Sequence, residues 1–581
     1  MTVLEDQVVD DDRGPLRQAT NRFRQAISRL RRSITSPSLE SLFILTVVLF
    51  GYRVGARPIG DNSMLTHLRT GIDMAMTGTI PRRDPYSYTA LGHEWVVQSW
   101  FPEWTYGWAF RLGGLELVVF EQALLVALLV WLVVRLARTG SPLRTALAGL
   151  TAVGVGAALW TPRPLLFGLI CMALLITVVE RRRSPWLLIP VMWVWVNSHG
   201  SFPLGGLWLG AVLVGELVDT RRLPRHDLRY VWGFLAGLAV SALNPLGPKL
   251  LFFPLTLGEK QEAFRNIVEW RSPDFSRGGG YFALFFIALA ILMLLRARLR
   301  WRDILPVVGF LAASLVAARN IGVLGVVLAP ALGRAMRRHG TGAPDASASA
   351  AAGAGPGLDP TADLDPTAGL GLAGGASSAD PADPEGAPPA PASAPAPTRA
   401  PAPTRADAPA PADPTGAGDD REPVGVGAGA RTGRSGDDRV QINRLMLLVL
   451  FAAFVVFTVP VAAESSLDLV GYPEAAMNHL RDEGRLVAPN RLVEQDFIGN
   501  YLEFRWPGVP VFIDDRFDMY PLSVSRDYEA LLNGRANSLE ILDRWDADSV
   551  LWQRKLPLVT ILRASGWRET YGDKDWVVLE R

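Results

Sequence analysis

Residues 165–179 read Leu-Leu-Phe-Gly-Leu-Ile-Cys-Met-Ala-Leu-Leu-Ile-Thr-Val-Val and are followed by Glu180 and by the arginines 181–183. A helix needs about 20 predominantly apolar residues to cross the roughly 30 Å hydrocarbon core of a bilayer. Windows that approach this length and composition recur along the 581 residues of the chain. The sequence therefore predicts an α-helical polytopic membrane protein.

The overall composition supports this prediction and excludes other classes. Hydrophobic residues make up 49% of the chain, and the mean hydropathy is +0.19, although a long central stretch is dominated by Ala, Pro, Gly and Asp. The remainder is therefore more apolar than a typical soluble protein. The net charge of +1 favours no nucleic-acid partner. The single cysteine, Cys171, excludes a disulfide framework and a thiolate metal cluster.

We predict roughly eleven transmembrane helices from these apolar windows. Their approximate bounds are Leu39–Gly55, Leu115–Arg135, Leu143–Trp160, Leu165–Val179, Pro185–Val196, Phe202–Val218, Leu228–Leu243, Gly280–Leu295, Ile304–Ala318, Ile321–Gly333 and Leu445–Ala463. The pair Arg319-Asn320 splits one long apolar run and is interpreted as an outer hairpin. The alternative is a single helix that carries a buried charge.

Arginines collect in alternate loops, and this asymmetry predicts the orientation because cytoplasmic loops are enriched in Lys and Arg. The arginine-rich segments are 22–32, 135–144, 181–183, 221–229, 296–302 and 334–338. We therefore expect the N-terminus to be cytoplasmic, with the first helix as an uncleaved anchor. The same parity places a long first loop, residues 56–114, and the C-terminal residues on the outer, extracytoplasmic side of the cell membrane.

The chain accordingly divides into five predicted parts. They are a cytoplasmic tail (1–38), a membrane domain (39–338), a cytoplasmic linker (339–441), a last transmembrane helix (442–463) and an extracytoplasmic α/β domain (464–581). The linker is rich in Ala, Pro and Gly and repeats Pro-Ala-Pro-Thr-Arg-Ala, a composition that cannot bury a core and is typical of disorder. A spacer role is favoured for it over partner binding.

Within residues 464–581, helical patterns alternate with short strand-like runs, which is typical of a small α/β fold. The helical patterns are Glu474–Glu483, Arg526–Leu532 and Ser538–Trp545, and the strand-like runs are Val509–Ile513, Ser549–Trp552 and Trp576–Glu580. The polar segment Asp514-Asp515-Arg516-Phe517-Asp518, which contains Asp515 and Arg516, directly follows the first of these runs. Functional loops often lie at the carboxyl ends of strands, which makes both residues candidates for a binding site. An ordinary charged turn explains them equally well.

The long first outer loop contains two amphipathic patterns. In residues 62–77, Leu65, Leu68, Ile72 and Ala75 share one helical face suited to the membrane interface. Trp100, Trp104 and Trp108 repeat every four residues, as expected of a helix at headgroup level. A packing helix without a catalytic role would show the same tryptophan pattern.

Polar residues outside the arginine-rich loops fall on the outer side under this topology. They are Asp61, His67, Arg69 and Asp84 in the first loop, and Arg163, Asn197, His199, Glu269, Arg319 and Asn320 at later helix ends. Each has a structural alternative; Asp61 suits a helix N-cap, and the arginines suit snorkelling to lipid phosphate. Charges near membrane depth tend to mark function, so their convergence predicts a site that handles an anion.

The segment Asp61-Asn-Ser-Met-Leu-Thr-His-Leu-Arg-Thr-Gly71, together with 78–89, resembles the first outer loop of the GT-C superfamily of polytopic membrane glycosyltransferases. The chain also resembles a set of uncharacterised bacterial membrane proteins in this loop, in the Trp-x-Asn-x-His-Gly turn at 195–200 and in the Asp-x-Arg segment at 514–516. The resemblance covers the membrane region and the C-terminal residues but not the linker. It departs from the best-known members because Asn62 follows Asp61, where those members carry an acidic pair.

The resemblance implies transfer of a sugar from a polyprenyl-phosphate donor to a glycan or protein acceptor at the outer face of the membrane. Asp61 is then the first choice for the general base and Asp84 the second, while Arg163 and Arg319 bind the lipid phosphate. The other named polar residues would position substrate; a divalent cation remains open as a cofactor. The alternatives are a transporter or flippase for a lipid-linked or anionic substrate and a non-catalytic envelope-assembly scaffold. Internal repeats would favour a transporter, and none is clear between the two halves.

Overall fold

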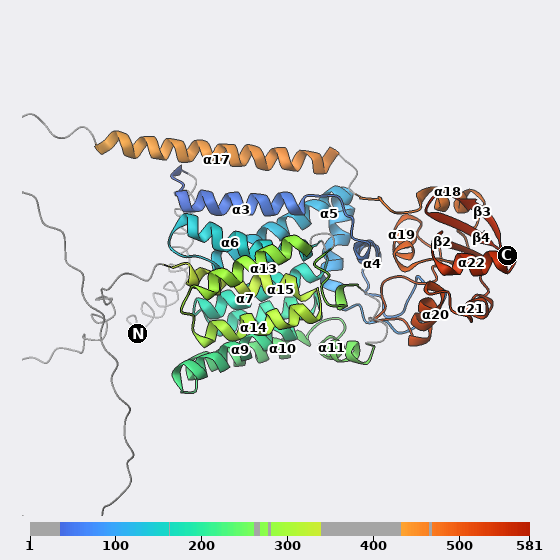
Figure 1. Ribbon diagram of the computed structural model, residues 1–581, viewed down its shortest axis with the longest axis horizontal. Helices are drawn as coiled ribbons and strands as arrows, with labels where there is room; N and C mark the ends of the chain where they lie inside the picture. Colours follow the sequence, from blue (N-terminus) through green and yellow to red (C-terminus); the bar gives the residue numbers. More distant parts are fainter. Residues whose placement is uncertain (1–34, 162, 261–267, 277–279, 338–431, 464–466) are drawn as a thin grey trace, which may run out of the picture. The chain divides into compact units, whose positions relative to one another are not determined.

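The computed structural model describes residues 35–161, 163–260, 268–276, 280–337, 432–463 and 467–581. Most of the predicted tail and linker lies outside these residues. Apolar helices pack side by side in a bundle (Figure 1). They are α3 (Leu39–Gly55), α5 (Trp100–Leu136), α6 (Pro142–Gly156), α7 (Leu165–Glu180), α8 (Leu188–Val196), α9 (Pro203–Thr220), α10 (Arg225–Ser241), α13 (Gly280–Leu295), α14 (Trp301–Val316), α15 (Asn320–Ala335) and α17 (Thr432–Ala463).

Every predicted transmembrane window is helical in the structure. Among the described residues, 4 helical segments are long and apolar enough to cross a membrane, namely Trp100–Leu136, Pro142–Leu159, Pro203–Thr220 and Val440–Val459. Other apolar helices, such as α7 and α15, are shorter. The chain is a helical membrane protein, while the number of helices that cross the bilayer stays a prediction.

Helix α5 contains two parts that meet at a kink. Gly114 has φ 67° and ψ −161°, a backbone conformation that glycine adopts without the strain a side chain would cause. The tryptophan-bearing segment from Trp100 thereby changes direction before the apolar segment predicted to begin at Leu115. Trp104 and Trp108 remain exposed on the first part, at 43% and 39% of their surface.

Helix α4 (Ser63–Thr77) occupies the predicted amphipathic segment, but its apolar face is covered by protein. Leu65, Leu68 and Ile72 are buried against α5 and the C-terminal helix α19 (Asp496–Arg505). The expectation that this face lies in the membrane interface was therefore wrong. The local 3.6-residue periodicity shows that one face is buried without showing what buries it.

Two glycines bring α4 and α5 into backbone contact. A Cβ atom on Gly71 would lie 2.0 Å from the carbonyl oxygen of Glu103, and one on Gly107 would lie 1.9 Å from the carbonyl oxygen of Gly71. A side chain at either position would therefore separate the two helices. This close approach sets His67 of α4 beside Glu103 of α5.

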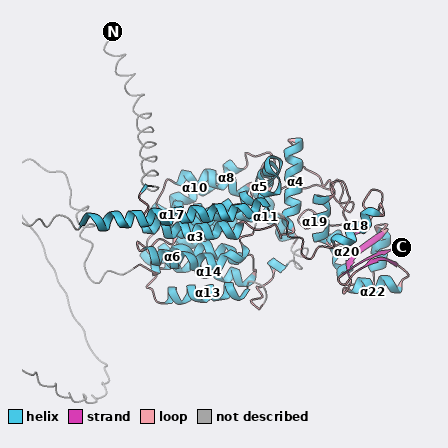
Figure 2. Cartoon of the chain, turned by 90° about the horizontal axis from the view of Figure 1, so that it is seen from above, coloured by secondary structure: helices cyan, strands magenta, loops and turns pink. Residues whose placement is uncertain are grey.

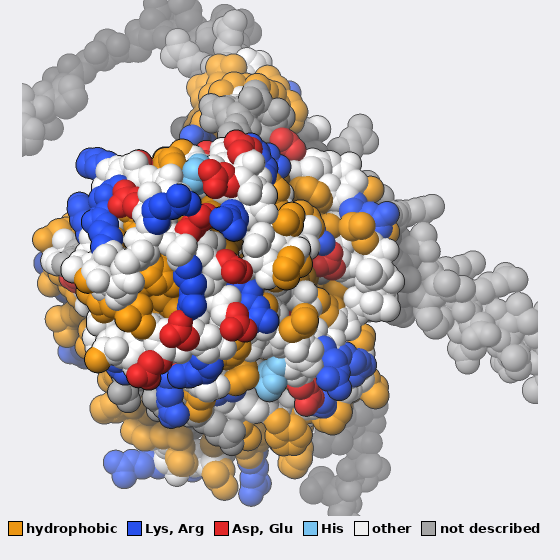
Figure 3. Space-filling model, turned by 90° about the vertical axis from the view of Figure 1, so that its right-hand side faces the viewer, with side chains coloured by type: hydrophobic (Ala, Val, Ile, Leu, Met, Phe, Trp, Pro, Cys, Tyr) orange, Lys and Arg blue, Asp and Glu red, His pale blue; other side chains and the backbone are white. Residues whose placement is uncertain are grey.

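The C-terminal region contains a four-stranded sheet in the order β1-β2-β4-β3 (Figure 2). Strand β1 (Leu492–Val493) runs parallel to β2 (Ser549–Gln553), whereas β4 (Trp576–Glu580) is antiparallel to both β2 and β3 (Arg568–Gly572). Helices α18 (Glu474–Asp482), α20 (Leu522–Leu532), α21 (Ser538–Arg544) and α22 (Pro557–Ala564) accompany the sheet. The predicted α/β character and the two predicted C-terminal strands are observed. The face of this region in Figure 3 shows basic and acidic side chains interspersed.

The run Val509–Ile513 was predicted as a strand and is not one. Val511 instead pairs with the first outer loop: its N–H donates to the Tyr86 carbonyl at 3.2 Å, and its own carbonyl accepts from the Tyr88 N–H at 3.0 Å. Trp95 of that loop also belongs to the hydrophobic core that contains Phe512. The first outer loop and the C-terminal region thus share one core.

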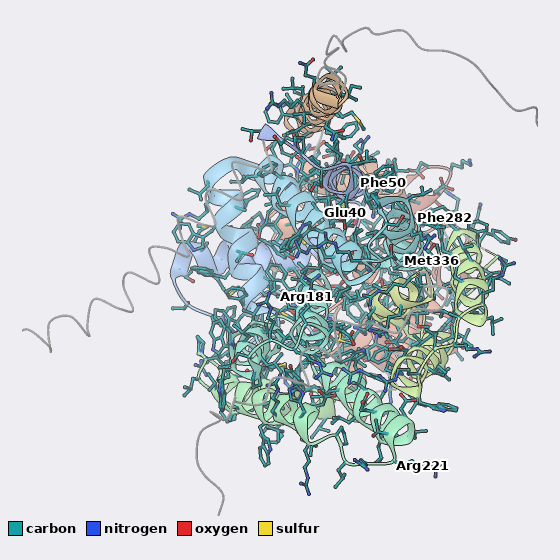
Figure 4. The ribbon with its side chains drawn as sticks, turned by 90° about the vertical axis from the view of Figure 1, so that its left-hand side faces the viewer. Glu40, Phe50, Arg181, Arg221, Phe282 and Met336 are labelled. Carbon is teal, nitrogen blue, oxygen red and sulfur yellow. The ribbon has the colours of Figure 1, made fainter. Side chains whose placement is uncertain are left out.

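Ion pairs join the helix ends that carry the arginine-rich loops. Arg334 of α15 pairs with Glu180 of α7 at 2.5 Å, and Arg138 after α5 pairs with Glu40 of α3 at 2.5 Å. Figure 4 views the bundle from this end, where Glu40 and Arg181 are labelled. Helix α7 runs from Glu180 at this end to Leu165 at the other. Arg163 lies just before Leu165 and lines the candidate site, so that site lies at the opposite end of the bundle.

Candidate functional site

A cavity of about 890 Å³ lies where the starts of α4, α7 and α9 meet the C-terminal region. Apolar residues from the bundle line one part, among them Leu165, Leu204 and Phe253. Charged and polar residues line the rest, and they come from both the bundle and the C-terminal region. The cavity is therefore amphipathic, with room for a ligand that has an apolar and a polar part.

Arg163, just before α7, connects two carboxylates at the cavity. Its Nε donates to Asp61, and its Nη1 donates to Glu269 at 2.7 Å. Burial opposes the charged form of the guanidinium, but these two carboxylates outweigh burial and raise the pKa of Arg163. Arg163 lines the cavity, with its charge already balanced by protein.

Asp61 is nearly buried, with 8% of its side chain exposed. One carboxylate oxygen accepts from Arg163, and the other, Oδ1, has no hydrogen-bond partner among the described residues. Asp61 is not among the cavity-lining residues, although its neighbours Asn62 and Ser63 are. The structure thus places Asp61 behind Arg163 in the wall of the site.

Arg319 lies immediately before α15 and lines the same cavity. Its guanidinium carbon lies 4.4 Å from the ring centroid of Trp270, an arrangement that stabilises a cation. Within the described residues its side chain forms no ion pair, and burial lowers the pKa of Arg319. Asn320 beside it donates to the Ala313 carbonyl at 2.9 Å, which ties the ends of α14 and α15 together.

Asp515 is one of the carboxylates that the C-terminal region contributes to the cavity. The hydroxyl of Ser63 donates to its Oδ2, and its main-chain N–H donates to Asn500 at 3.1 Å. Burial raises the pKa of Asp515 to about 6, and the hydrogen bond from Ser63 opposes this shift. A carboxyl group with this pKa can accept a proton near neutral pH better than an ordinary aspartate.

Two histidines border the cavity, and their pKa values are shifted in opposite directions. Nδ1 of His67 lies 2.7 Å from Glu103. Burial favours neutral His67, but the contact with Glu103 outweighs burial and raises the pKa. His199 accepts a hydrogen bond from the Ser201 N–H at 3.1 Å, and burial together with Arg319 lowers its pKa well below the usual value. His199 is therefore neutral and can act as an uncharged donor through its other nitrogen.

Asp84 and Arg516 belong to a buried ionic cluster and do not line the cavity. Arg516 pairs with Asp84 at 2.8 Å and with Asp514 at 2.5 Å, and its guanidinium carbon lies 4.5 Å from the Trp95 ring centroid. Because Asp84 and Trp95 are in the first outer loop, the cluster fixes that loop to the C-terminal region. It also holds the chain on both sides of Asp515.

Arg69 and Asn197 likewise make contacts within the protein. Arg69 pairs with Asp73 one turn later on α4, at 3.1 Å from its Nε. Asn197 is fully buried; it donates to the Trp193 carbonyl at 2.7 Å and accepts from the Trp100 indole at 2.9 Å. Neither lines the cavity. Their contacts position α4 and the start of α5.

Several cavity residues carry no sequence signal of their own, notably Gln98, Gln495, Asp518 and Ser525. Of these four, only Asp518 lies in a segment that the sequence singled out, Asp514–Asp518. In the part of the chain that the structure describes, no group of three or more His, Cys, Asp or Glu side chains is arranged to hold a metal ion. The carboxylates Asp61 and Glu269 are instead bridged by Arg163.

A comparison with solved structures finds a protein of similar fold, whereas comparisons with protein families and curated proteins find none. No family model matches the chain, and no curated protein matches it. Among solved structures, the chain is similar to the crystal structure of ArnT from Cupriavidus metallidurans bound to undecaprenyl phosphate. The identity is 12% and the TM-score 0.45, over 92% of this chain and 97% of that chain. No residue role in this chain is taken from that protein.

Proposed function

We propose that the protein is a membrane glycosyltransferase that moves a sugar from a polyprenyl-phosphate donor to an acceptor hydroxyl in the cavity. One observation carries this proposal: the same cavity is lined by Arg319, which forms no ion pair with any described residue, and by Asp515, a carboxyl group with a pKa of about 6. These are the two charges that glycosyl transfer from a phosphate donor requires. The proposal agrees with the GT-C resemblance of the sequence.

The donor phosphate is assigned to Arg319. A guanidinium presents a planar fork of N–H donors that matches two phosphate oxygens. Arg163 already donates to two carboxylates, so its remaining capacity for an added anion is smaller. Leu165, Leu204 and Phe253 supply the apolar surface that the first part of a polyprenyl chain would contact.

Asp515 is assigned as the general base. In the transfer step, the acceptor oxygen forms a bond to the anomeric carbon while the bond from that carbon to the phosphate oxygen breaks. The acceptor proton passes to Asp515, and the polyprenyl phosphate departs with the bonding electrons. Arg319 and the neutral His199 donate hydrogen bonds to the charge that develops on the leaving oxygen.

Asp61, the base expected from the resemblance, receives a positioning role here. Its pairing with Arg163 fixes the start of α4, where Ser63 donates to Asp515. Asp84 is likewise assigned to the cluster around Arg516. No step of the proposal uses a metal ion, and two of the carboxylates at the site, Asp61 and Glu269, are engaged by Arg163.

The proposal places the reaction on the outer face of the membrane. The arginine-rich helix ends lie at the end of the bundle opposite to the cavity, and such ends are cytoplasmic by the positive-inside rule. The sugar would then be transferred after the lipid-linked donor has reached the outer leaflet.

The direct test is donor turnover by the full chain reconstituted in lipid nanodiscs. Undecaprenyl-phosphate-linked glucose and mannose would be supplied with an envelope fraction of the source organism as acceptor, and released undecaprenyl phosphate would be measured by mass spectrometry. We expect turnover by the wild-type protein and by an Asp575→Asn control, whose carboxylate is exposed and remote from the cavity. Asp515→Asn should lose it. Donor binding without turnover in the wild type would instead indicate a flippase.

A further inference from the structure

One part of the cavity has no role in the donor chemistry. It is formed by Gln495, Asp496, Phe517, Asp518, Ser525 and Tyr528, which we call the outer wing. These residues come from the start of α19, from the turn after Asp515 and from α20. Asp515 lies just before the turn that carries Phe517 and Asp518, and it lines the same cavity as Arg319.

Two buried oxygens in the outer wing lack partners. Gln495 and Ser525 are 5% and 8% exposed, and no described residue forms a hydrogen bond with Oε1 of Gln495 or Oγ of Ser525. Buried polar atoms in native proteins are nearly always hydrogen-bonded, so these two atoms at a cavity can accept hydrogen bonds from a ligand. Ser525 precedes Tyr528 by three residues on α20, which places both on one helical face.

Asp518 adds a third group with unused capacity. No other residue in the described part of the chain donates a hydrogen bond to its carboxylate or forms an ion pair with it. Lys260 donates instead to the main-chain carbonyls of Asp518 and Tyr520. Asp496 is partly used, since it accepts from the Tyr528 hydroxyl at 2.9 Å. The outer wing is therefore rich in acceptors and needs hydrogen-bond donors from its ligand.

The rings of Phe517 and Tyr528 complete the wing, with centroids 6.2 Å apart. Flat aromatic side chains offer an apolar surface next to polar groups. A pyranose ring has the matching properties, because its hydroxyls donate hydrogen bonds and its C–H face is apolar. The carboxylates of Asp496 and Asp518 disfavour an anionic ligand, and Arg526, the cation of α20 at the same cavity, already has an interaction partner.

We propose that the outer wing binds the acceptor of the transfer reaction and that this acceptor is a neutral, hydroxyl-rich glycan. The proposal rests on the proposed function for the meaning of "acceptor", but glycan binding itself can be measured separately. The attacking hydroxyl would reach Asp515 from the side of Phe517 and Asp518, opposite to the phosphate on Arg319.

The test is ligand-observed NMR by saturation transfer on the full chain in nanodiscs, with three trisaccharide probes. Maltotriose is neutral, trigalacturonate is anionic and the chitosan trimer is cationic. We expect maltotriose to bind more tightly than either charged probe. Gln495→Met and Ser525→Ala should each weaken maltotriose binding by about ten-fold, which corresponds to about 1.4 kcal/mol.

Ser523→Ala is the matched control, because Ser523 is exposed on the same helix and does not line the cavity. It should bind maltotriose like the wild type, and thermal unfolding should show that all three variants are folded. Failure of the wild type to bind maltotriose, tighter binding of a charged probe, or variants that bind like Ser523→Ala would each overturn the proposal.

Undecaprenyl phosphate binding, measured on the same samples, separates this proposal from the proposed function. Gln495→Met and Ser525→Ala should bind undecaprenyl phosphate like the wild type. If the wild type binds maltotriose as expected but not undecaprenyl phosphate, the glycosyltransferase proposal fails while the glycan site stands. If the wild type binds undecaprenyl phosphate but no trisaccharide, the outer-wing proposal alone fails.

Discussion

The hydroxyl of Ser63, at the start of α4, donates a hydrogen bond to the carboxylate of Asp515 in the C-terminal region. Ser63 lies two residues after Asp61, which is held by Arg163 in the loop before α7. The bundle, the first outer loop and the C-terminal region therefore all contribute to the environment of one carboxylate. A change in either of these two contacts should therefore change the pKa of Asp515.

Replacement of Asp515 tests its role as the base most directly. Loss of a general base typically lowers the rate by about 10² to 10⁴. Asp515→Asn should therefore reduce donor turnover by this factor while undecaprenyl phosphate binding is retained, since Arg319 is unchanged. Asp575→Asn should be fully active. If Asp515→Asn and its control turn over donor at equal rates, the proton goes elsewhere.

The pH dependence of turnover follows from the pKa of Asp515. Burial raises this pKa to about 6, and the ionised form is the one that accepts a proton. The rate should therefore rise as the pH increases through about 6 and level off above it. The Ser63→Ala variant removes a hydrogen bond that stabilises the ionised form, so its profile should shift to higher pH. An unchanged midpoint in Ser63→Ala would contradict the assignment of the profile to Asp515.

Arg319 can be distinguished from a membrane anchor by a pair of substitutions. Arg319→Lys keeps the charge but loses the planar fork, whereas Arg319→Ala loses both. We expect undecaprenyl phosphate binding to fall in the order wild type, Lys, Ala. Arg225→Lys is the control, because Arg225 is exposed at the start of α10 at the opposite end of the bundle. Simple snorkelling to lipid headgroups would give Arg319→Lys the affinity of the wild type.

The Asp61–Arg163 pair should matter for stability before it matters for chemistry. Arg163→Gln leaves the carboxylates of Asp61 and Glu269 without their shared cation, and an unsatisfied buried group costs about 1–3 kcal/mol, more when it is charged. The variant should unfold at a lower temperature than the wild type. Adding Asp61→Asn removes one of the stranded charges and should recover part of the loss. A double variant that is less stable than Arg163→Gln alone would show that Asp61 is not stabilised mainly by Arg163.

The sequence predicted those features that depend on local composition. Each apolar window is helical because consecutive apolar residues and their periodicity are written in neighbouring positions. The contact between Thr89 and the Phe512 carbonyl joins positions 423 residues apart, and no local pattern encodes it. That pairing converts the predicted strand at Val509–Ile513 into a partner of the first outer loop. Asp84 and Arg516 were both predicted as site residues, but they form an ion pair with each other. Because this ion pair depends on the same distant pairing, no local pattern could predict it.

The candidate site was predictable to a similar degree. Arg163, Glu269 and Arg319 were named because charged residues near apolar windows are costly, and Asp515 because it follows a strand-like run. The structure brings these four residues to one cavity. The roles of Asp61 and Asp515 could not be separated in the sequence, since both are aspartates beside amphipathic elements. Their difference arises from burial and from partners on distant segments. Gln495 and Ser525 gave no signal because uncharged polar residues are common in any loop or helix.

The membrane orientation is the last prediction, and the proposed outer-face reaction depends on it. The arginine-rich loops predict that the end of the bundle near Arg181 and Arg222 is cytoplasmic and that the C-terminal region is outside. A cysteine at Ser565, which is exposed in the C-terminal region, should react with a membrane-impermeant maleimide in intact cells. A cysteine at Arg222, which is exposed after α9, should react only after permeabilisation. Both variants need a Cys171→Ala background; Cys171 is buried, so this background should remain folded. The reverse labelling pattern would place the cavity on the cytoplasmic side, where Arg319 and Asp515 could act only on donors in the inner leaflet.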